Sequence, residues 1–116
     1  MRIIGVDSDS RQGQVLKNEL RKVGFRLSEL EFVTECHEDG WYMLFGSSPL
    51  KGLFPDLKMA DVARELLHHP ENENALIVPN YAPGYIYHNP NLKPLWIDGL
   101  EQAFVYYSLD VKGVIA

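Results

Sequence analysis

Residues 2–10 read RIIGVDSDS, and this stretch decides how the chain begins to fold. The β-branched run at its start is typical of a buried strand, and the polar residues that follow indicate a turn. Ser8, Asp9 or Ser10 can cap a helix, because a short oxygen-bearing side chain accepts a hydrogen bond from a free amide in the first helical turn. The stretch therefore predicts a strand that ends near Asp7 and leads directly into a helix.

The rest of the chain continues with alternating strands and helices. Apolar spacing (Val15, Leu16, Leu20 and Val23) predicts that the first helix runs to Val23, with Gly24 as its C-cap. The further elements that we expect begin with a half-exposed strand over 30–36 and a strand over 41–45, joined by the Asp39-Gly40 turn as an antiparallel hairpin. They continue with a helix over 57–68, a strand over 75–78 ended by Pro79, a helix over 95–107, with a strand over 103–107 as the alternative, and a short strand over 111–115. Residues 46–55 and 81–94 are rich in turn formers and are expected as loops, with a short strand over 84–88 as the alternative in the second.

The order of these elements predicts an α+β fold in a single domain over residues 1–116. Strand, helix, strand, strand, helix and strand in succession match a ferredoxin-like βαββαβ core, here followed by a C-terminal helix and a short strand. No apolar run approaches the roughly 20 residues that cross a bilayer, and the first residues do not resemble a signal peptide. With a single cysteine, Cys36, no internal disulfide can form. We therefore expect a soluble, cytoplasmic protein.

The charges are unevenly distributed along the chain. Eleven basic and sixteen acidic residues give a net charge of −5, which argues against a nucleic-acid or anionic-membrane partner. The exposed face of the first helix nevertheless carries Arg11, Lys17, Arg21 and Lys22. These bases are a candidate anion-binding surface, and the alternative is a solvated face that pairs with the acidic strand over 30–36.

Residues 6–25 resemble the first strand and helix of phosphoacceptor receiver domains, because an acidic strand end precedes a leucine-bearing helix and a closing Gly24-Phe25 pair. Lys93-Pro94 stands where that family has its Lys-Pro. The resemblance implies magnesium-dependent phosphate chemistry at Asp7 and Asp9, with Asp61 as the phosphoacceptor. The family places a strand before that acceptor, whereas the spacing around Asp61 is helical.

Residues 3–7 are also similar to the opening strand of RNase H-like nucleases, including Holliday-junction resolvases, in which an aspartate at this place binds a divalent metal. Such chemistry needs several converging carboxylates. Pro79 and Asn80 stand where a further acid is expected. As candidate metal ligands, Asp7 and Asp9 therefore compete with their simpler interpretation as turn and capping residues.

The histidines and the cysteine give no metal-binding pattern. His37, His68, His69 and His88 have neither the C-x-x-C nor the H-x-x-x-H spacing of a preformed zinc site. We expect surface histidines, a buried structural thiol at Cys36, and no cofactor. The tyrosines Tyr81, Tyr85 and Tyr87, together with Trp96, could stack on bases, line a ligand pocket, or pack under the Pro-rich loop.

The C-terminal helix is apolar on two sides. Its core-facing stripe consists of Trp96, Leu100, Ala103, Phe104 and Tyr107. Val105, Tyr106 and Leu109 fall near the opposite side with Glu101, and a small domain has little material to cover both sides. We therefore expect a non-catalytic interaction protein that binds a protein partner or itself through these residues. The alternative is the magnesium-dependent phosphate chemistry at Asp7 and Asp9.

Overall fold

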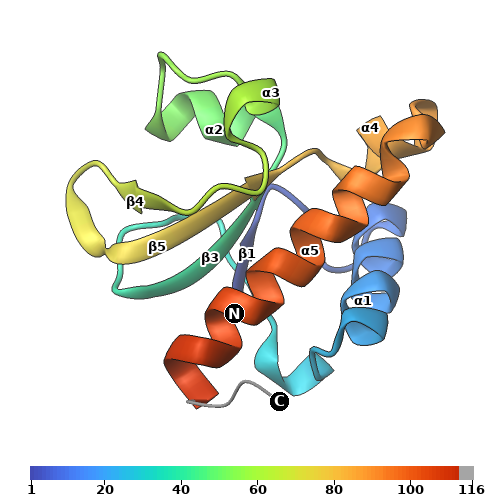
Figure 1. Ribbon diagram of the computed structural model, residues 1–116, viewed down its shortest axis with the longest axis horizontal. Helices are drawn as coiled ribbons and strands as arrows, with labels where there is room; N and C mark the ends of the chain where they lie inside the picture. The colour runs from blue at the N-terminus through green and yellow to red at the C-terminus, as the bar shows by residue number, and fades with distance from the viewer. Residues whose placement is uncertain (113–116) are drawn as a thin grey trace.

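A five-stranded mixed sheet lies at the centre of the computed structural model, which describes residues 1–112 (Figure 1). The strands are β1 (Arg2–Ile4), β2 (Glu31–Phe32), β3 (Gly40–Phe45), β4 (Leu67–His69) and β5 (Asn72–Asn80). The helices are α1 (Arg11–Val23), α2 (Ser47–Leu53), α3 (Met59–Val62), α4 (Pro83–His88) and α5 (Lys93–Tyr107), with short helical turns η1 (Leu27–Glu29), η2 (Pro90–Leu92) and η3 (Ser108–Lys112). Within the described residues, no helix has the length and apolar content of a membrane span.

The strands lie in the order β2-β1-β3-β5-β4, and the expected α+β fold is confirmed. The ferredoxin-like arrangement is wrong. β1 pairs in parallel with β2 on one side and with β3 on the other, and β3 pairs in parallel with β5. Only β4 is antiparallel, at the edge beside β5. The predicted hairpin does not form, because β1 lies between its two strands and pairs with each of them.

Helices cover the two faces of the sheet and give the molecule three layers (Figure 1). α1, α4 and α5 pack on one face, whereas α2 and α3 pack on the other. β3 shows why both faces are apolar: Trp41, Met43 and Phe45 belong to the core under α1 and α5, while Tyr42 and Leu44 belong to the second core. Alternate side chains of a strand point to opposite faces, so this one strand connects the two cores.

Helix α1 agrees closely with its prediction. The Ser10 hydroxyl accepts a 3.0 Å hydrogen bond from the Gly13 amide, and Gly24 closes the helix with a φ of 134°. Leu16 and Leu20 are buried in the core. Val15, which was expected on the buried face, is 46% exposed, and Val23 is half-buried.

The predicted helix over 57–68 is wrong beyond Val62. Arg64 adopts a left-handed conformation (φ 74°), and its amide donates a hydrogen bond to the carbonyl of Pro79. The chain then enters β4, where Leu67 lies opposite Ile77. The free edge of β5 thus overrides the local helical spacing. The expected strand over 30–36 is shortened to the two residues of β2, and its pairing with β1 ends where the Val33 amide donates to the carbonyl of Ile3.

The turn-rich segments contain helices. α2 lies in the expected 46–55 loop, and α4 and η2 lie in the expected 81–94 loop. Pro79 does not end its strand, because β5 continues to Asn80. β4 pairs with β5 only as far as Ile77, so Pro79 borders no strand on that side. The strand expected over 111–115 lies partly outside the described residues, and its first two residues belong to η3.

Candidate functional site

The outward side of α5 and η3 exposes apolar side chains, as predicted. Val105 is 45% exposed and Leu109 is 42% exposed. Glu101 is exposed beside them, and Tyr106 is half-buried. We call these residues, Glu101, Val105, Tyr106 and Leu109, the C-terminal surface. The core-facing stripe is confirmed at Trp96, Leu100, Ala103 and Tyr107, which are buried, while Phe104 is half-buried with its ring edge-on to Phe25 at 4.9 Å.

Two contacts fix this surface to the start of β3. The indole Nε1 of Trp41 donates a 2.7 Å hydrogen bond to Asp110 Oδ2. The ring of Tyr106 stacks on the indole, with centroids 6.4 Å apart and an interplanar angle of 16°. Val105 therefore faces outward on an anchored helix. This anchor could not be predicted from local sequence patterns, because Trp41 and Asp110 are 69 residues apart.

The four predicted anion-binding bases do not gather into one site. Lys17 lies with its Nζ 5.4 Å from the ring centroid of Phe32, and Lys22 forms an ion pair with Glu19 at 3.3 Å. Arg21 and Lys22 border a shallow hollow beside Asn18. Arg11 lies apart from them, at the opening of a cavity. The predicted basic face is thus an exposed helix side whose bases border two different hollows, Arg21 and Lys22 one and Arg11 the other.

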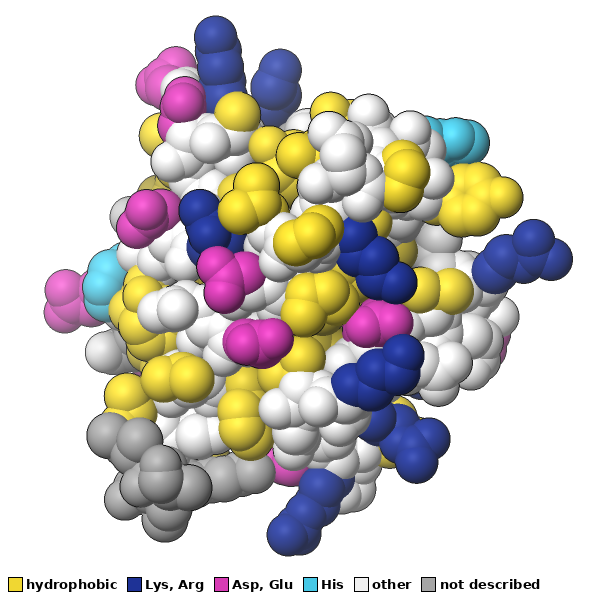
Figure 2. Space-filling model, turned by 45° about the vertical axis from the view of Figure 1, so that its right-hand side comes forward, with side chains coloured by type: hydrophobic (Ala, Val, Ile, Leu, Met, Phe, Trp, Pro, Cys, Tyr) yellow, Lys and Arg dark blue, Asp and Glu magenta, His cyan; other side chains and the backbone are white. Residues whose placement is uncertain are grey.

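This cavity has a volume of about 560 Å³ and lies between α1, α4, η2 and the start of α5. We call it the Trp96 cavity, and its lining residues are Arg11, Gln12, Val15, Pro83, Gly84, Ile86, Tyr87, His88, Pro90, Lys93 and Trp96. Two of the four aromatic residues considered from sequence, Tyr87 and Trp96, line it. Tyr81 and Tyr85 instead stack on each other, with centroids 5.1 Å apart. Figure 2 shows hydrophobic side chains among lysine and arginine side chains on this side of the molecule.

A second hollow, of about 720 Å³, lies at the carboxyl ends of β1 and β2, beside the start of α2, which follows β3, and includes Asp7 in its wall. Ligands often bind at this place in sheets whose strand order reverses there. Asp7 accepts a hydrogen bond at Oδ1 from the amide of Asp9 at 3.0 Å, which is the geometry of a turn. Within residues 1–112, no three His, Cys, Asp or Glu side chains come close enough to hold a metal ion.

The position of Asp61 differs from what the receiver resemblance implies. Asp61 is an exposed residue of α3 and does not follow a strand. β3, which lies beside β1, is followed by Gly46 and not by an aspartate. The first strand also ends earlier than predicted, at Ile4, and Asp7 lies in the segment between β1 and α1.

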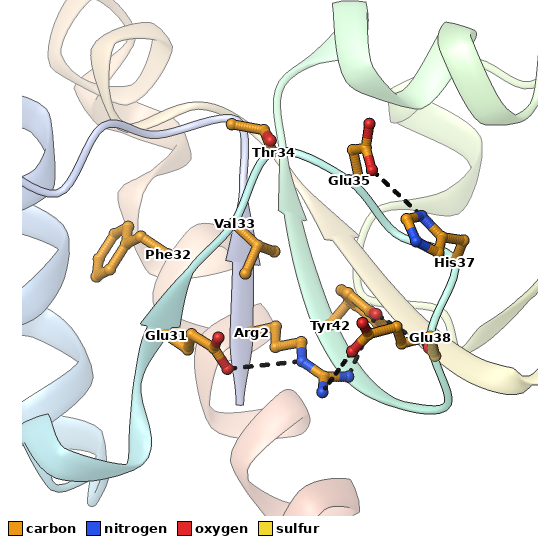
Figure 3. Close-up of a pocket in the computed structure, with 9 residues that line it drawn as sticks. All are labelled: Arg2, Glu31, Phe32, Val33, Thr34, Glu35, His37, Glu38 and Tyr42. Carbon is orange, nitrogen blue, oxygen red and sulfur yellow. Dashed lines mark hydrogen bonds and ion pairs between the residues drawn. The ribbon is translucent and has the colours of Figure 1, made fainter.

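A third hollow lies between β2 and the segment that leads to β3, and Figure 3 shows how Arg2 closes it. The Arg2 guanidinium donates to the carbonyl of Asp39 at 2.8 Å and to Glu38 Oε2 at 3.2 Å, and its Nε lies 3.6 Å from Glu31 Oε2. It also lies 5.4 Å from the centroid of the Tyr42 ring. Of the acidic side chains expected on the strand face, Glu31 pairs with Arg2 and Glu35 lies 3.5 Å from His37 Nδ1, and neither forms an ion pair with α1 within residues 1–112.

Cys36 is buried, as predicted. Burial raises the pKa of its thiol to about 11, although nearby Arg2 opposes that shift. The thiol is therefore protonated at neutral pH and is a poor nucleophile. The neighbouring histidines make local contacts: the His68 ring lies 2.7 Å from the carbonyl of Glu73, and the His69 ring accepts a hydrogen bond from the amide of Glu71.

In comparisons with known proteins, the sequence matches no family model and no curated protein.

Proposed function

We propose that this chain is a small, non-catalytic, cytoplasmic interaction protein that binds a protein partner, or a second copy of itself, through the C-terminal surface. The observation that carries the proposal is the exposure of Val105 and Leu109 on a helix whose opposite side is buried. These residues are four positions apart and therefore lie on the same side of the helix. Apolar side chains at the centre of an interface with a polar rim are typical of protein contacts.

The anchor at Trp41 strengthens this proposal. Tyr106 stacks on Trp41, and Asp110 accepts its indole hydrogen bond, so the side of the helix next to the Val105–Leu109 strip is held at two points. The strip cannot turn inward without breaking these contacts. A preorganised surface binds with a smaller entropic cost than a mobile one.

The charges around the strip favour a partner with a basic rim. Glu101 is exposed at its edge, and the chain as a whole carries a net charge of −5. Asp98, one turn earlier, already forms a 2.9 Å ion pair with Arg64. Glu101 forms no ion pair among the residues that the structure describes, so it is available to a lysine or arginine across an interface.

Photo-crosslinking tests the proposal. A photoreactive phenylalanine analogue at position 105 is expected to give a discrete crosslinked product in the cells that make the protein. The same analogue at Leu27, which is 49% exposed on η1, is the matched control. Adding Leu109→Glu should suppress the product from position 105 because a charge then lies at the apolar centre. Light scattering of the purified protein distinguishes a second copy from another partner.

The proposal is overturned if position 105 gives no product beyond that of position 27 and the purified protein scatters as a monomer. It is also overturned if Leu109→Glu leaves the crosslinked product unchanged. Circular dichroism of each variant establishes that it is folded.

The alternative function, magnesium-dependent phosphate chemistry at Asp7 and Asp9, has one observation in its favour. Asp7 borders the 720 Å³ hollow at the end of β1, beside Ser48 and Thr34. Saturable shifts of the Asp7 and Asp9 amide signals with Mg²⁺, detected by NMR, would support this alternative.

A further inference from the structure

The Trp96 cavity has the size and the lining of a small-molecule site, independent of the C-terminal surface. Its volume of about 560 Å³ falls in the range that drug-sized ligands occupy. Ile86 and Trp96 form its floor and are 5% and 2% exposed. Val15 and Tyr87 stand at its opening and are 46% and 82% exposed. An apolar floor with exposed apolar residues at the opening indicates a ligand with an apolar body.

Hydrogen bonds within the protein hold Trp96 at the floor of this cavity. Trp96 Nε1 donates to the carbonyl of Tyr81 at 2.8 Å, and the Trp96 carbonyl accepts from Asn80 Nδ2 at 3.0 Å. Asn80 is buried, and its Oδ1 accepts from the amide of Tyr81. The polar atoms of Trp96 are thus satisfied inside the protein, and what the indole offers to the cavity is its apolar ring.

The close approach of α4 to α1 shapes the opposite wall. A Cβ atom on Gly84 would lie 2.5 Å from Gln12 Nε2. The Gln12 side chain would therefore have to move to admit a larger residue at position 84. Gln12 and Gly84 both line it.

The charge at the opening is positive. Arg11 and Lys93 line the cavity together with His88, and no aspartate or glutamate is among the lining residues. Arg11 forms no ion pair within residues 1–112. Lys93 Nζ lies 3.9 Å from Glu19 Oε1, but that carboxylate is closer to Lys22, at 3.3 Å. Two cations beside an apolar floor are complementary to a negative group on an apolar body.

We propose that the Trp96 cavity binds a small organic anion. Its ring-sized apolar body lies against Trp96, Ile86 and Val15, and its carboxylate, phosphate or sulfonate group is held by Arg11 and Lys93. The volume of about 560 Å³ suits a small molecule. The cavity and the C-terminal surface have no residue in common, so ligand binding in the cavity does not depend on partner binding at the surface.

Two related fluorescent probes test this assignment. The sulfonate 8-anilinonaphthalene-1-sulfonate and the neutral N-phenyl-1-naphthylamine share one ring system and differ in the anionic group. We expect the sulfonate to bind saturably and more tightly than the neutral probe. Arg11→Ala and Lys93→Gln should each weaken sulfonate binding about fivefold, as expected for one charge-assisted contact near the surface. They should leave the neutral probe unaffected. Arg21→Ala is the matched control, because it removes a cation of α1 outside the cavity.

The two tryptophans locate the bound probe. In a ¹H–¹⁵N spectrum, the indole signal of Trp96 should move on titration with the sulfonate, while that of Trp41, which lies at the C-terminal surface, should not. The proposal is overturned if the sulfonate does not bind saturably, if it moves the Trp41 signal instead, or if Arg11→Ala and Lys93→Gln bind it as tightly as Arg21→Ala does. The same spectra show whether each variant is folded.

Discussion

Trp41 and Asp110 are joined by a 2.7 Å hydrogen bond from the indole Nε1 to the carboxylate Oδ2, across 69 residues of sequence. The bond connects the second residue of β3 to the helical turn that follows α5. Because the donor and the acceptor lie in separate elements, this bond and the stacking of Tyr106 on Trp41 together position the end of α5 over the sheet.

Removing the acceptor should therefore destabilise the protein. We expect Asp110→Ala to lower the free energy of unfolding by about 1–2 kcal/mol, because the indole N–H loses a charged partner in a partly buried place. Asp110→Asn keeps a carbonyl acceptor and should lose less. Urea denaturation followed by Trp fluorescence measures both variants. Equal stability of wild type and Asp110→Ala would contradict the anchoring role.

Charges on the C-terminal surface should leave the fold intact. Val105→Glu and Leu109→Glu are each expected to change the free energy of unfolding by less than about 0.5 kcal/mol, since both side chains are substantially exposed. Leu100→Ala on the buried side of α5 should cost about 2–5 kcal/mol. Thermal unfolding by circular dichroism compares the three. A large loss in Val105→Glu would mean that this side chain is part of the core.

Two glycines in helices should respond oppositely to alanine. A Cβ on Gly13 would clash with the carbonyl oxygen of Asp7 and lie 2.6 Å from that of Ser8. No atom lies within 4 Å of a Cβ on Gly52. Gly52→Ala in α2 should stabilise by up to about 1 kcal/mol, whereas Gly13→Ala should destabilise. Chemical denaturation decides the sign, and a stabilising Gly13→Ala would contradict the close turn at Asp7.

Stability should fall at alkaline pH because of Cys36. Its pKa is raised from 9.0 to about 11 by burial, so below pH 9 the thiol is protonated in both folded and unfolded protein. Between pH 9 and 11 the unfolded chain loses this proton first, and the free energy of unfolding should drop by as much as about 2–3 kcal/mol. Cys36→Ala should show a smaller drop over the same range. Parallel slopes for the two proteins would contradict the buried thiol.

Asp7 and Asp9 should behave as turn residues. The Asp7 carboxylate accepts from the Asp9 amide, and asparagine offers a carbonyl oxygen in the same place. Replacing both with Asn is expected to change the free energy of unfolding by less than about 1 kcal/mol. Wild type and variant should show the same melting temperature with and without Mg²⁺. A Mg²⁺-dependent rise in the wild type alone would instead favour the phosphate-chemistry alternative.

For each candidate site, the sequence predicted some of the residues but not their neighbours from distant segments. Helical spacing placed Val105 and Leu109 opposite the buried stripe of α5, and the structure exposes both. The spacing could not reveal Trp41 as their neighbour. The helix-face pattern groups Arg11 with the bases of its own helix, whereas in the structure Arg11 lines a cavity together with His88 and Lys93 from distant segments. Grouping by helix face includes only residues a few positions apart, while a pocket is lined from several elements.

The sequence by itself determined helix α1, from a cap within residues 8–10, which the structure shows to be Ser10, to its end at Gly24, because the interactions that start and stop it join residues a few positions apart. It also determined that α5 is a helix with one buried side. Only the tertiary structure decided how the strands pair and that residues 67–69 form a strand instead of a helical turn. The hydrogen bonds of a strand are completed by whichever distant segment lies beside it, and the local sequence does not specify that neighbour.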